Sequence, residues 1–291
     1  MSLNDNTQSS NDSAVIRHIL ASRSDSPNAF GSKIPVYTAL KINRWEDLLL
    51  DYHDKIVVDV LKYCWPINYR ASQSPHSTMC NHPSALAFPD HVRHYIQTEL
   101  SFGAIAAPFS TNPLHNPSVC SPLQTVPKRG SSKRRVVLDL SFPPTFSVNS
   151  GIPWNTYLDS PFKLRLPGID RLCEFILAKG RDCCVYKKDR QRVYRQFPID
   201  PKDYYLLGFT FYFDTRCPFG LRTSAMFCQR TTMSVIYIFK QAGFSADIYL
   251  DDFYGAECPS LADNAFATLQ SILDTLGLAS SPEKDSRRPL R

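Results

Sequence analysis

The sequence predicts an α+β fold in which helices pack on an antiparallel sheet. Segments with helical apolar spacing alternate along the chain with short segments rich in β-branched and aromatic residues. Near the C-terminal end, two such short segments are joined by a tight turn, which indicates antiparallel pairing. At 291 residues the chain exceeds one average domain and can bury a sizeable core.

The N-terminal third divides into two predicted parts. Residues 1–32 are rich in Ser, Asn and Asp and lack apolar periodicity, which predicts a disordered leader. Residues 33–106 are predicted to form a helical extension. Its first helix covers 45–61, where apolar residues recur at helical spacing, and its second runs from an N-cap at Asp90 to a stop before Gly103.

A basic hairpin follows. Residues 123–126 and 136–140 have strand character, and the loop Lys128–Lys133 between them carries a cluster of positive charge. A second cluster lies between Lys179 and Arg195, in a chain with a net charge of +6. Clustered basic charge is typical of phosphate contact, although either cluster alone is also compatible with a solvated basic face.

Cysteine usage and hydropathy bear on location. The nine cysteines are odd in number and irregularly spaced, which favours free thiols in a reducing compartment. No apolar run reaches membrane-spanning length, and the N-terminus is polar. We therefore expect an intracellular protein, cytoplasmic or nuclear, that is not secreted and does not contact a membrane.

The second half of the chain contains the clearest elements. Helices are predicted at 168–179, 223–241 and 260–276, the last with a capping box formed by Ser260 and Asp263. A strand at 183–187 leads into Asp189.

The most informative stretch is Tyr249–Asp252. It places two adjacent carboxylates, Asp251 and Asp252, at the turn of a hairpin with apolar flanks. Like charges this close repel, and divalent cations such as Mg²⁺ are the usual means of neutralising them. An exposed acidic turn is the alternative.

The motifs of the chain, in their order, resemble those of reverse transcriptases. The stretch Lys188–Gln196 contains Asp189 and Tyr194, the next motif is Pro218–Leu221, and the Asp pair comes last. Pro-Phe-Gly-Leu, Tyr-Arg-Gln-Phe-Pro and Val-Val-Leu-Asp-Leu-Ser are similar to segments of DIRS-type retrotransposons, which encode a tyrosine recombinase. The resemblance implies a right-hand polymerase fold, with fingers and an antiparallel palm sheet in residues 107–291. It also implies truncation after the palm, with the thumb missing.

The resemblance assigns the metal-binding acids. Asp189 and Asp251 would share two Mg²⁺ ions, or Mn²⁺ in their place, with Asp252 as a supporting third acid. One ion would activate the primer 3′ hydroxyl and the other would hold the triphosphate. For Asp189, a helix N-cap after a strand is the alternative.

The resemblance also assigns the nucleotide-binding residues. Lys128 and Arg135 correspond to residues that hold the triphosphate, and Phe219 and Gly220 to the lining of the nucleotide pocket. Tyr194 corresponds to the residue beneath the incoming sugar that excludes a 2′ hydroxyl, although a core tyrosine would give the same pattern.

The resemblance also indicates roles for Lys284 and Gln229. Lys284 corresponds to a lysine near the leaving pyrophosphate, or is a surface lysine without that role. Gln229 is placed near the template. Two residues depart from the family pattern: Arg190 puts a cation beside the expected metal site, and Val193 adds bulk next to the sugar pocket.

The function implied is RNA-directed DNA polymerase activity: template-directed DNA synthesis from an RNA or DNA template by two-metal nucleotidyl transfer. Its partners would be a template–primer and dNTPs, and its origin a retrotransposon. The alternative is a catalytically inactive, truncated remnant that binds nucleic acid. The sequence does not predict an oligomeric state.

Overall fold

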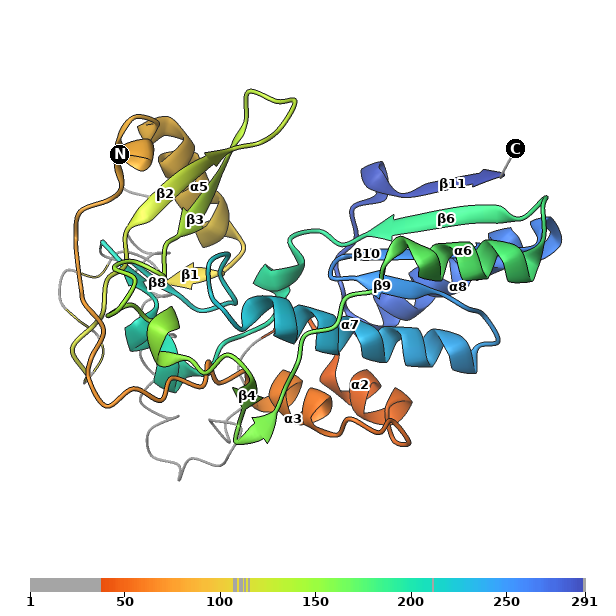
Figure 1. Ribbon diagram of the computed structural model, residues 1–291, viewed down its shortest axis with the longest axis horizontal. Coiled ribbons are helices and arrows are strands. Elements are labelled where there is room, and N and C mark those ends of the chain that lie inside the picture. Colours follow the sequence, from red (N-terminus) through yellow and green to blue (C-terminus); the bar gives the residue numbers. More distant parts are fainter. Residues whose placement is uncertain are drawn as a thin grey trace, which may run out of the picture. The chain divides into compact units, whose positions relative to one another are not determined.

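The computed structural model describes residues 38–106, 109, 112, 114, 116–210 and 212–289 (Figure 1). The chain divides into two compact units. The described residues of the first unit fall within Tyr63–Phe162 and Pro198–Ser224, and those of the second within 38–62, Lys163–Phe197 and 225–289. The predicted leader, 1–32, lies outside the described residues.

The second unit is built on a four-stranded sheet in the order β11-β6-β10-β9. Every neighbouring pair is antiparallel, as the sequence predicted. β11 was not predicted. The strands are β6 (Cys184–Asp189), β9 (Asp247–Tyr249), β10 (Asp252–Glu257) and β11 (Ser286–Pro289).

Helices α6 (Ile169–Lys179) and α8 (Pro259–Leu276) cover opposite faces of this sheet (Figure 1). Strand side chains alternate between faces. Phe175 of α6 packs against Ala256 of β10, whereas Tyr186 of β6 meets Phe266 of α8 with ring centroids 6.5 Å apart. Burial of both faces explains why β10 is apolar along most of its length.

The predicted helix at 45–61 is two helices, α2 (Ile42–Leu48) and α3 (Ile56–Tyr63). Tertiary contacts to α7 (Ser224–Gln241) hold the break between them. The Asp54 carboxylate accepts hydrogen bonds from Arg230 at 2.5 and 2.9 Å, and the Tyr52 ring lies 5.0 Å from that of Tyr237. These contacts outweigh helical propensity, which is a weak determinant over a few residues.

The first unit contains the predicted basic hairpin and two further small sheets. β2 (Leu123–Pro127) pairs with β3 (Arg134–Leu138), so the hairpin prediction is confirmed. The others are a three-stranded sheet, β1-β8-β7, and the pair β4-β5. Their strands are β1 (Ile105–Ala106), β4 (Thr156–Tyr157), β5 (Ser160–Pro161), β7 (Gly208–Phe209) and β8 (Tyr212–Asp214).

Two predicted helix caps are wrong. Helix α5 (Pro89–Ser101), which follows the short α4 (Pro83–Leu86), has Phe88 at its N-cap, and Asp90 lies inside its first turn. Helix α8 has Cys258 at its N-cap. In both helices a proline occupies the first position, where its fixed φ favours helix initiation without a side-chain cap. Within the described residues no helix combines the length and apolarity needed to span a membrane.

Candidate active site

The structure brings the three predicted acids together at one end of the sheet in the second unit. Asp189 is the last residue of β6, and Asp252, the first residue of β10, lies directly opposite it. Residues paired in this way have Cβ atoms about 4.5–5.5 Å apart on the same face of the sheet. Asp251 occupies the turn, and its carbonyl accepts a hydrogen bond from Arg190 N–H at 3.1 Å.

Gln229 of α7 holds the turn in place. Leu250 adopts a φ of 57°, which is unfavourable for a residue other than glycine. The Gln229 side chain accepts the Leu250 N–H at 2.8 Å and donates to the Ile248 carbonyl at 2.9 Å. Gln229 is only 5 % exposed, so in this structure it supports the acidic hairpin. A polar residue inside the apolar stripe of a predicted helix was the signal in the sequence.

The three carboxylates form a negatively charged cluster that two lysines partly neutralise. Burial raises the pKa of Asp251, and the charges of Asp252 and Asp189 add to the effect. Lys284 Nζ lies 2.9 Å from Asp189 Oδ1, and Lys187 Nζ lies 3.0 Å from Asp252 Oδ1. The bond to Asp189 raises the pKa of Lys284.

The chemistry of these donors suits Mg²⁺, which prefers carboxylate oxygens. Burial and the neighbouring carboxylates disfavour the ionised form of Asp251 and raise its pKa, and a bound cation would favour that form. Over the described ranges, however, no group of three or more His, Cys, Asp or Glu side chains is arranged to hold a metal ion. Lys284 and Lys187 occupy the positions next to Asp189 and Asp252 that a cation would take. The donor set fits the ion, and binding requires these lysines to move aside.

A buried polar network behind Asp189 was missed by the sequence reasoning. The Asp285 carboxylate accepts the Asp189 N–H at 3.0 Å and pairs with Lys188 Nζ at 2.8 Å. The Lys188 side chain is 2 % exposed, donates to Gln270 at 3.0 Å and lies 3.7 Å from the centroid of the Phe266 ring. The network fixes the backbone at Asp189 to helix α8 and to residues just before β11. A lysine at an inward-facing strand position was the available signal.

Arg190 lies beside Asp189 in sequence but on the opposite face of the sheet. Its side chain is 1 % exposed, donates to Ser280 Oγ at 2.9 Å and lies 5.6 Å from the centroid of the Phe253 ring. Burial lowers the pKa of Arg190 to about 10, while nearby carboxylates including Asp285 oppose the shift. The guanidinium is therefore a buried structural cation, packed over Phe253 on the face of the sheet opposite the Asp189 side chain.

Tyr194 and Val193 lie in a 3₁₀ helix, Val193–Gln196, that follows β6 in the second unit. Val193 is 4 % exposed, so its extra bulk is accommodated in the core. Tyr194 is half-buried, and its carbonyl accepts the Phe197 N–H at 3.2 Å.

Four of the five predicted nucleotide-binding residues lie in the first unit, and the structure brings three of these four together. The Arg135 guanidinium lies 5.1 Å from the centroid of the Phe219 ring. Gly220 has a φ of +104°, and a Cβ there would lie 2.1 Å from the Leu138 carbonyl oxygen, so only glycine fits. Lys128 is exposed at the start of the hairpin loop, where its N–H donates to the Lys133 carbonyl at 3.0 Å.

Comparison with known proteins gives structural matches alone. No protein-family model and no curated protein matches the chain. Solved structures of foamy virus protease–reverse transcriptase do match. A complex with double-stranded DNA has a TM-score of 0.59 and 18% identity over 92% of this chain. The CSH mutant of the prototype foamy virus protein has 0.57 and 18% over 96%. A complex with an RNA/DNA hybrid has 0.55 and 19% over 88%.

The chain spans 46%, 33% and 35% of the length of these three structures, respectively. At this level of identity, the likeness concerns the fold. Together with the antiparallel sheets and the mixed helices and strands, it shows that the chain has a reverse-transcriptase-like fold.

Proposed function

We propose that this chain is the polymerase part of a retrotransposon reverse transcriptase of the DIRS type and catalyses template-directed DNA synthesis. The observation that carries the proposal is the pairing of Asp189 with Asp252 across β6 and β10, with Asp251 in the adjoining turn. Two-metal transfer of a nucleotide requires carboxylates clustered on rigid elements, and neighbouring strands provide that placement.

Each residue has a role in this proposal. Mg²⁺, when bound, supplies Lewis-acid stabilisation of the phosphate oxygens, and Asp189 and Asp251 would hold it. Asp252 adds negative charge beside them. Lys284, whose ammonium lies 2.9 Å from Asp189, would transfer its contact to the leaving pyrophosphate when metal and nucleotide bind.

The residues of the first unit would orient the nucleotide. The Arg135 guanidinium can bind phosphate oxygens bidentately, and its contact with Phe219 restricts its orientation. Lys128 would add a second positive charge. The half-buried ring of Tyr194, in the second unit, would select deoxyribose by excluding a 2′ hydroxyl.

Nucleic acid is the proposed partner. Structures with this fold are found in complex with double-stranded DNA and with an RNA/DNA hybrid. The basic loop Lys128–Lys133 supplies charge suited to a phosphate backbone.

The test is extension of a DNA primer on an RNA template with dNTPs and Mg²⁺. We expect extension by the chain and a loss of roughly a hundredfold or more in Asp189→Asn and Asp251→Asn, as for other preorganised electrostatic groups. Asp182→Asn is the matched control, because Asp182 is an exposed carboxylate in the turn before β6. Extension that survives both site substitutions would refute the assignment.

A second candidate function is nucleic-acid binding without synthesis. The lysine contacts to Asp189 and Asp252 favour it, because an ammonium at each carboxylate competes with a divalent ion. If it is correct, the protein binds a template–primer but does not extend it at any Mg²⁺ or Mn²⁺ concentration. Extension that rises with metal concentration excludes it.

A further inference from the structure

One tryptophan of the first unit is displayed on the surface. Trp45 and Trp65 are 0% exposed, whereas Trp154 is 81% exposed. Isolated exposed apolar residues are common, so exposure alone carries no meaning. Trp154 differs because a fixed cation supports its ring.

The cation is Arg222, whose guanidinium lies 3.7 Å from the centroid of the Trp154 ring. Two hydrogen bonds fix Arg222: its N–H donates to Asn149 Oδ1 at 2.8 Å, and its Nη1 donates to the Ile152 carbonyl. Partial burial lowers the pKa of Arg222, but a guanidinium remains charged near neutrality. The stacked pair is thus a preorganised surface that presents an aromatic ring with a cation beneath it.

The same asparagine ties this pair to the predicted nucleotide-binding segment. Asn149 Nδ2 donates to the Gly220 carbonyl at 2.7 Å and to Ser141 Oγ at 2.8 Å. Gly220 itself tolerates no side chain because of the Leu138 carbonyl. The Trp154–Arg222 pair is therefore held in a fixed relation to Phe219 and Gly220, which the resemblance to reverse transcriptases assigns to the nucleotide pocket.

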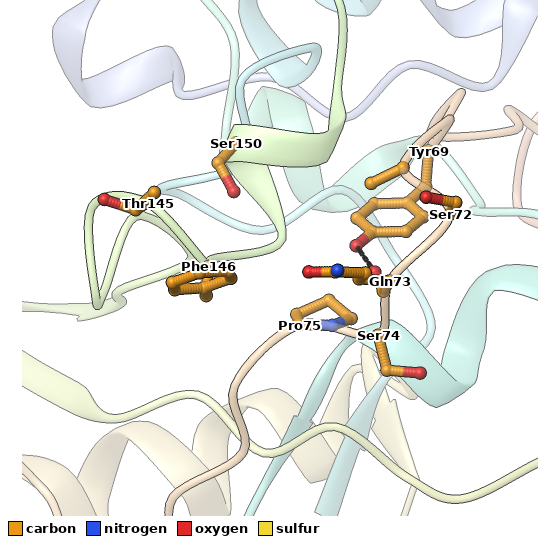
Figure 2. A pocket seen from close by; sticks show the side chains of 9 residues that line it. Tyr69, Ser72, Gln73, Ser74, Pro75, Thr145, Phe146 and Ser150 are labelled. Carbon is orange, nitrogen blue, oxygen red and sulfur yellow. Dashed lines mark hydrogen bonds between the residues drawn. The ribbon is translucent and has the colours of Figure 1, made fainter.

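A cavity whose lining includes two aromatic rings lies close to Trp154 in sequence. It has a volume of about 220 Å³ and no charged lining residue. Figure 2 shows the Tyr69 and Phe146 rings among its lining: Phe146 lies in the loop that precedes the 3₁₀ helix Asn149–Gly151, which carries Ser150, and Tyr69 lies in the facing segment. Ser150 is four residues before Trp154, which limits the separation of their Cα atoms to about 15 Å. Phe146 is 54% exposed, so this region displays two aromatic side chains.

We propose that Trp154 and Arg222 form a stacking platform for an unpaired base of single-stranded nucleic acid. Aromatic rings bind bases regardless of sequence because every base has a π-face, and an arginine adds cation–π and phosphate contacts. The lining of the cavity beside Tyr69 and Phe146 is uncharged and carries several hydroxyl groups, so it adds no repulsion toward phosphates. The proposal rests on the proposed function, within which the strand is the unpaired part of the template.

The test uses quenching of Trp154 fluorescence, since the other two tryptophans are buried and a bound base cannot stack on them. Titration with short oligo(dT) and oligo(U) single strands should quench the emission saturably, and added salt should weaken the binding. A blunt DNA duplex of equal length should quench much less, because its bases are already stacked.

Binding of a fluorescein-labelled single strand, measured by anisotropy, provides the matched comparison. Trp154→Ala should weaken binding by roughly 5- to 150-fold, the range expected for loss of one base–aromatic stack. Trp154→Phe should retain most of the affinity, because it retains a stacking ring. Leu177→Ala is the control: Leu177 is 82% exposed on α6 in the other unit, and its removal should leave affinity unchanged.

Either of two results would overturn the platform: single strands that leave the emission of the wild-type protein unchanged, or a folded Trp154→Ala variant that binds as tightly as wild type. If Trp154→Ala fails to fold, the quenching of the wild-type protein and the affinity of Trp154→Phe still test the stacking platform. A surface for a protein partner would give no quenching by either oligonucleotide. If single strands quench Trp154 but the protein does not extend primers, the polymerase proposal is refuted and the stacking platform is supported. If the protein extends primers but single strands do not quench Trp154, the stacking platform is refuted and the polymerase proposal is supported.

Discussion

Lys188 and Asp285 show how the chain positions its carboxylates residue by residue. A lysine that is 2 % exposed is costly unless paired, and Asp285 pairs with it while also accepting the Asp189 N–H. The pair is therefore structural, yet it acts on the backbone of the residue that we expect to hold a metal ion. Lys284 directly precedes Asp285 in the chain, and its ammonium contacts the Asp189 carboxylate.

Asp285→Asn or Lys188→Met should lower the free energy of unfolding by about 3–5 kcal/mol, because each leaves a buried charge without its partner. The double variant Lys188→Met/Asp285→Asn should recover most of that loss, since no buried charge remains. Urea denaturation measures all three.

The control is Asp47→Asn. Asp47 pairs with Arg44 at 3.7 Å, but both side chains are more than 60 % exposed, at 66% and 63%. Such a pair should change stability by about 1 kcal/mol or less. Additive losses in the double variant of Lys188 and Asp285 would contradict the buried-pair interpretation.

The sequence predicted that the three carboxylates lie together, but not the contacts that hold them in place. Asp189, Asp251 and Asp252 were identifiable because carboxylates at strand ends and turns are chemically distinctive. The roles of Gln229 and Lys188 depend on which side chains of distant segments meet them, and no local pattern specifies that. Arg190 was expected near the metal site, but strand alternation directs its side chain to the other face.

At the scale of elements, the segment containing Phe219 and Gly220 packs tightly against strand β3. Gly220→Ala should destabilise the protein by about 2–4 kcal/mol, because the new Cβ would lie 2.1 Å from the Leu138 carbonyl oxygen at a positive φ. Gly130→Ala is the matched control. Gly130 also has a positive φ, +68°, but nothing lies within 4 Å of a Cβ there, so about 1 kcal/mol is expected. Thermal unfolding compares them, and equal losses would contradict the close-packing explanation.

The 3₁₀ helix Pro201–Leu206 carries a pH-dependent contact. Burial, with Asp200 adding to it, raises the pKa of Asp203 to about 7 from 3.8, although its carboxylate accepts the Ile67 N–H at 2.7 Å. A raised pKa means that the folded state binds the proton more tightly than the unfolded state. This contribution is complete below pH 3.8 and is lost as pH rises to about 7.

The free energy of unfolding should therefore fall between about pH 4 and 7, by at most about 1.4 kcal/mol per pH unit from this group. Asp203→Asn should remove that part of the slope, because Asn stays neutral and can still accept the Ile67 N–H. Urea denaturation across this pH range makes the comparison. An identical slope in wild type and variant would exclude Asp203 as the cause.

Elements with strong local signals were predictable, and those set by tertiary contacts were not. The hairpins at 123–138 and 247–257 follow from strand composition and turn residues. The break between α2 and α3 follows from the pairing of Asp54 with Arg230, which lies far along the chain. β11 depends on a partner strand, β6, that precedes it by about a hundred residues in sequence.

For the molecule as a whole, the predicted site residues divide between the two units. The carboxylates, Tyr194 and Lys284 belong to the second unit, and Lys128, Arg135, Phe219 and Gly220 to the first. Both groups were assigned from the order of the motifs, through their resemblance to those of reverse transcriptases. Each unit contributes a separate part of the proposed chemistry: cation binding in one, and phosphate and base contacts in the other.

We propose that the end of the sheet at Asp189 and Asp252 is a divalent-cation site. Mn²⁺ binding, followed by the loss of the EPR signal of the free ion, tests it without requiring catalysis. We predict binding by the wild-type protein that Asp189→Asn and Asp251→Asn each weaken roughly tenfold or more, because carboxylate charge sets the affinity. Lys284→Met should strengthen binding by removing the competing ammonium, and Asp182→Asn should leave it unchanged. Mn²⁺ binding that is the same in wild type, Asp189→Asn and Asp251→Asn would show that these carboxylates do not bind the ion.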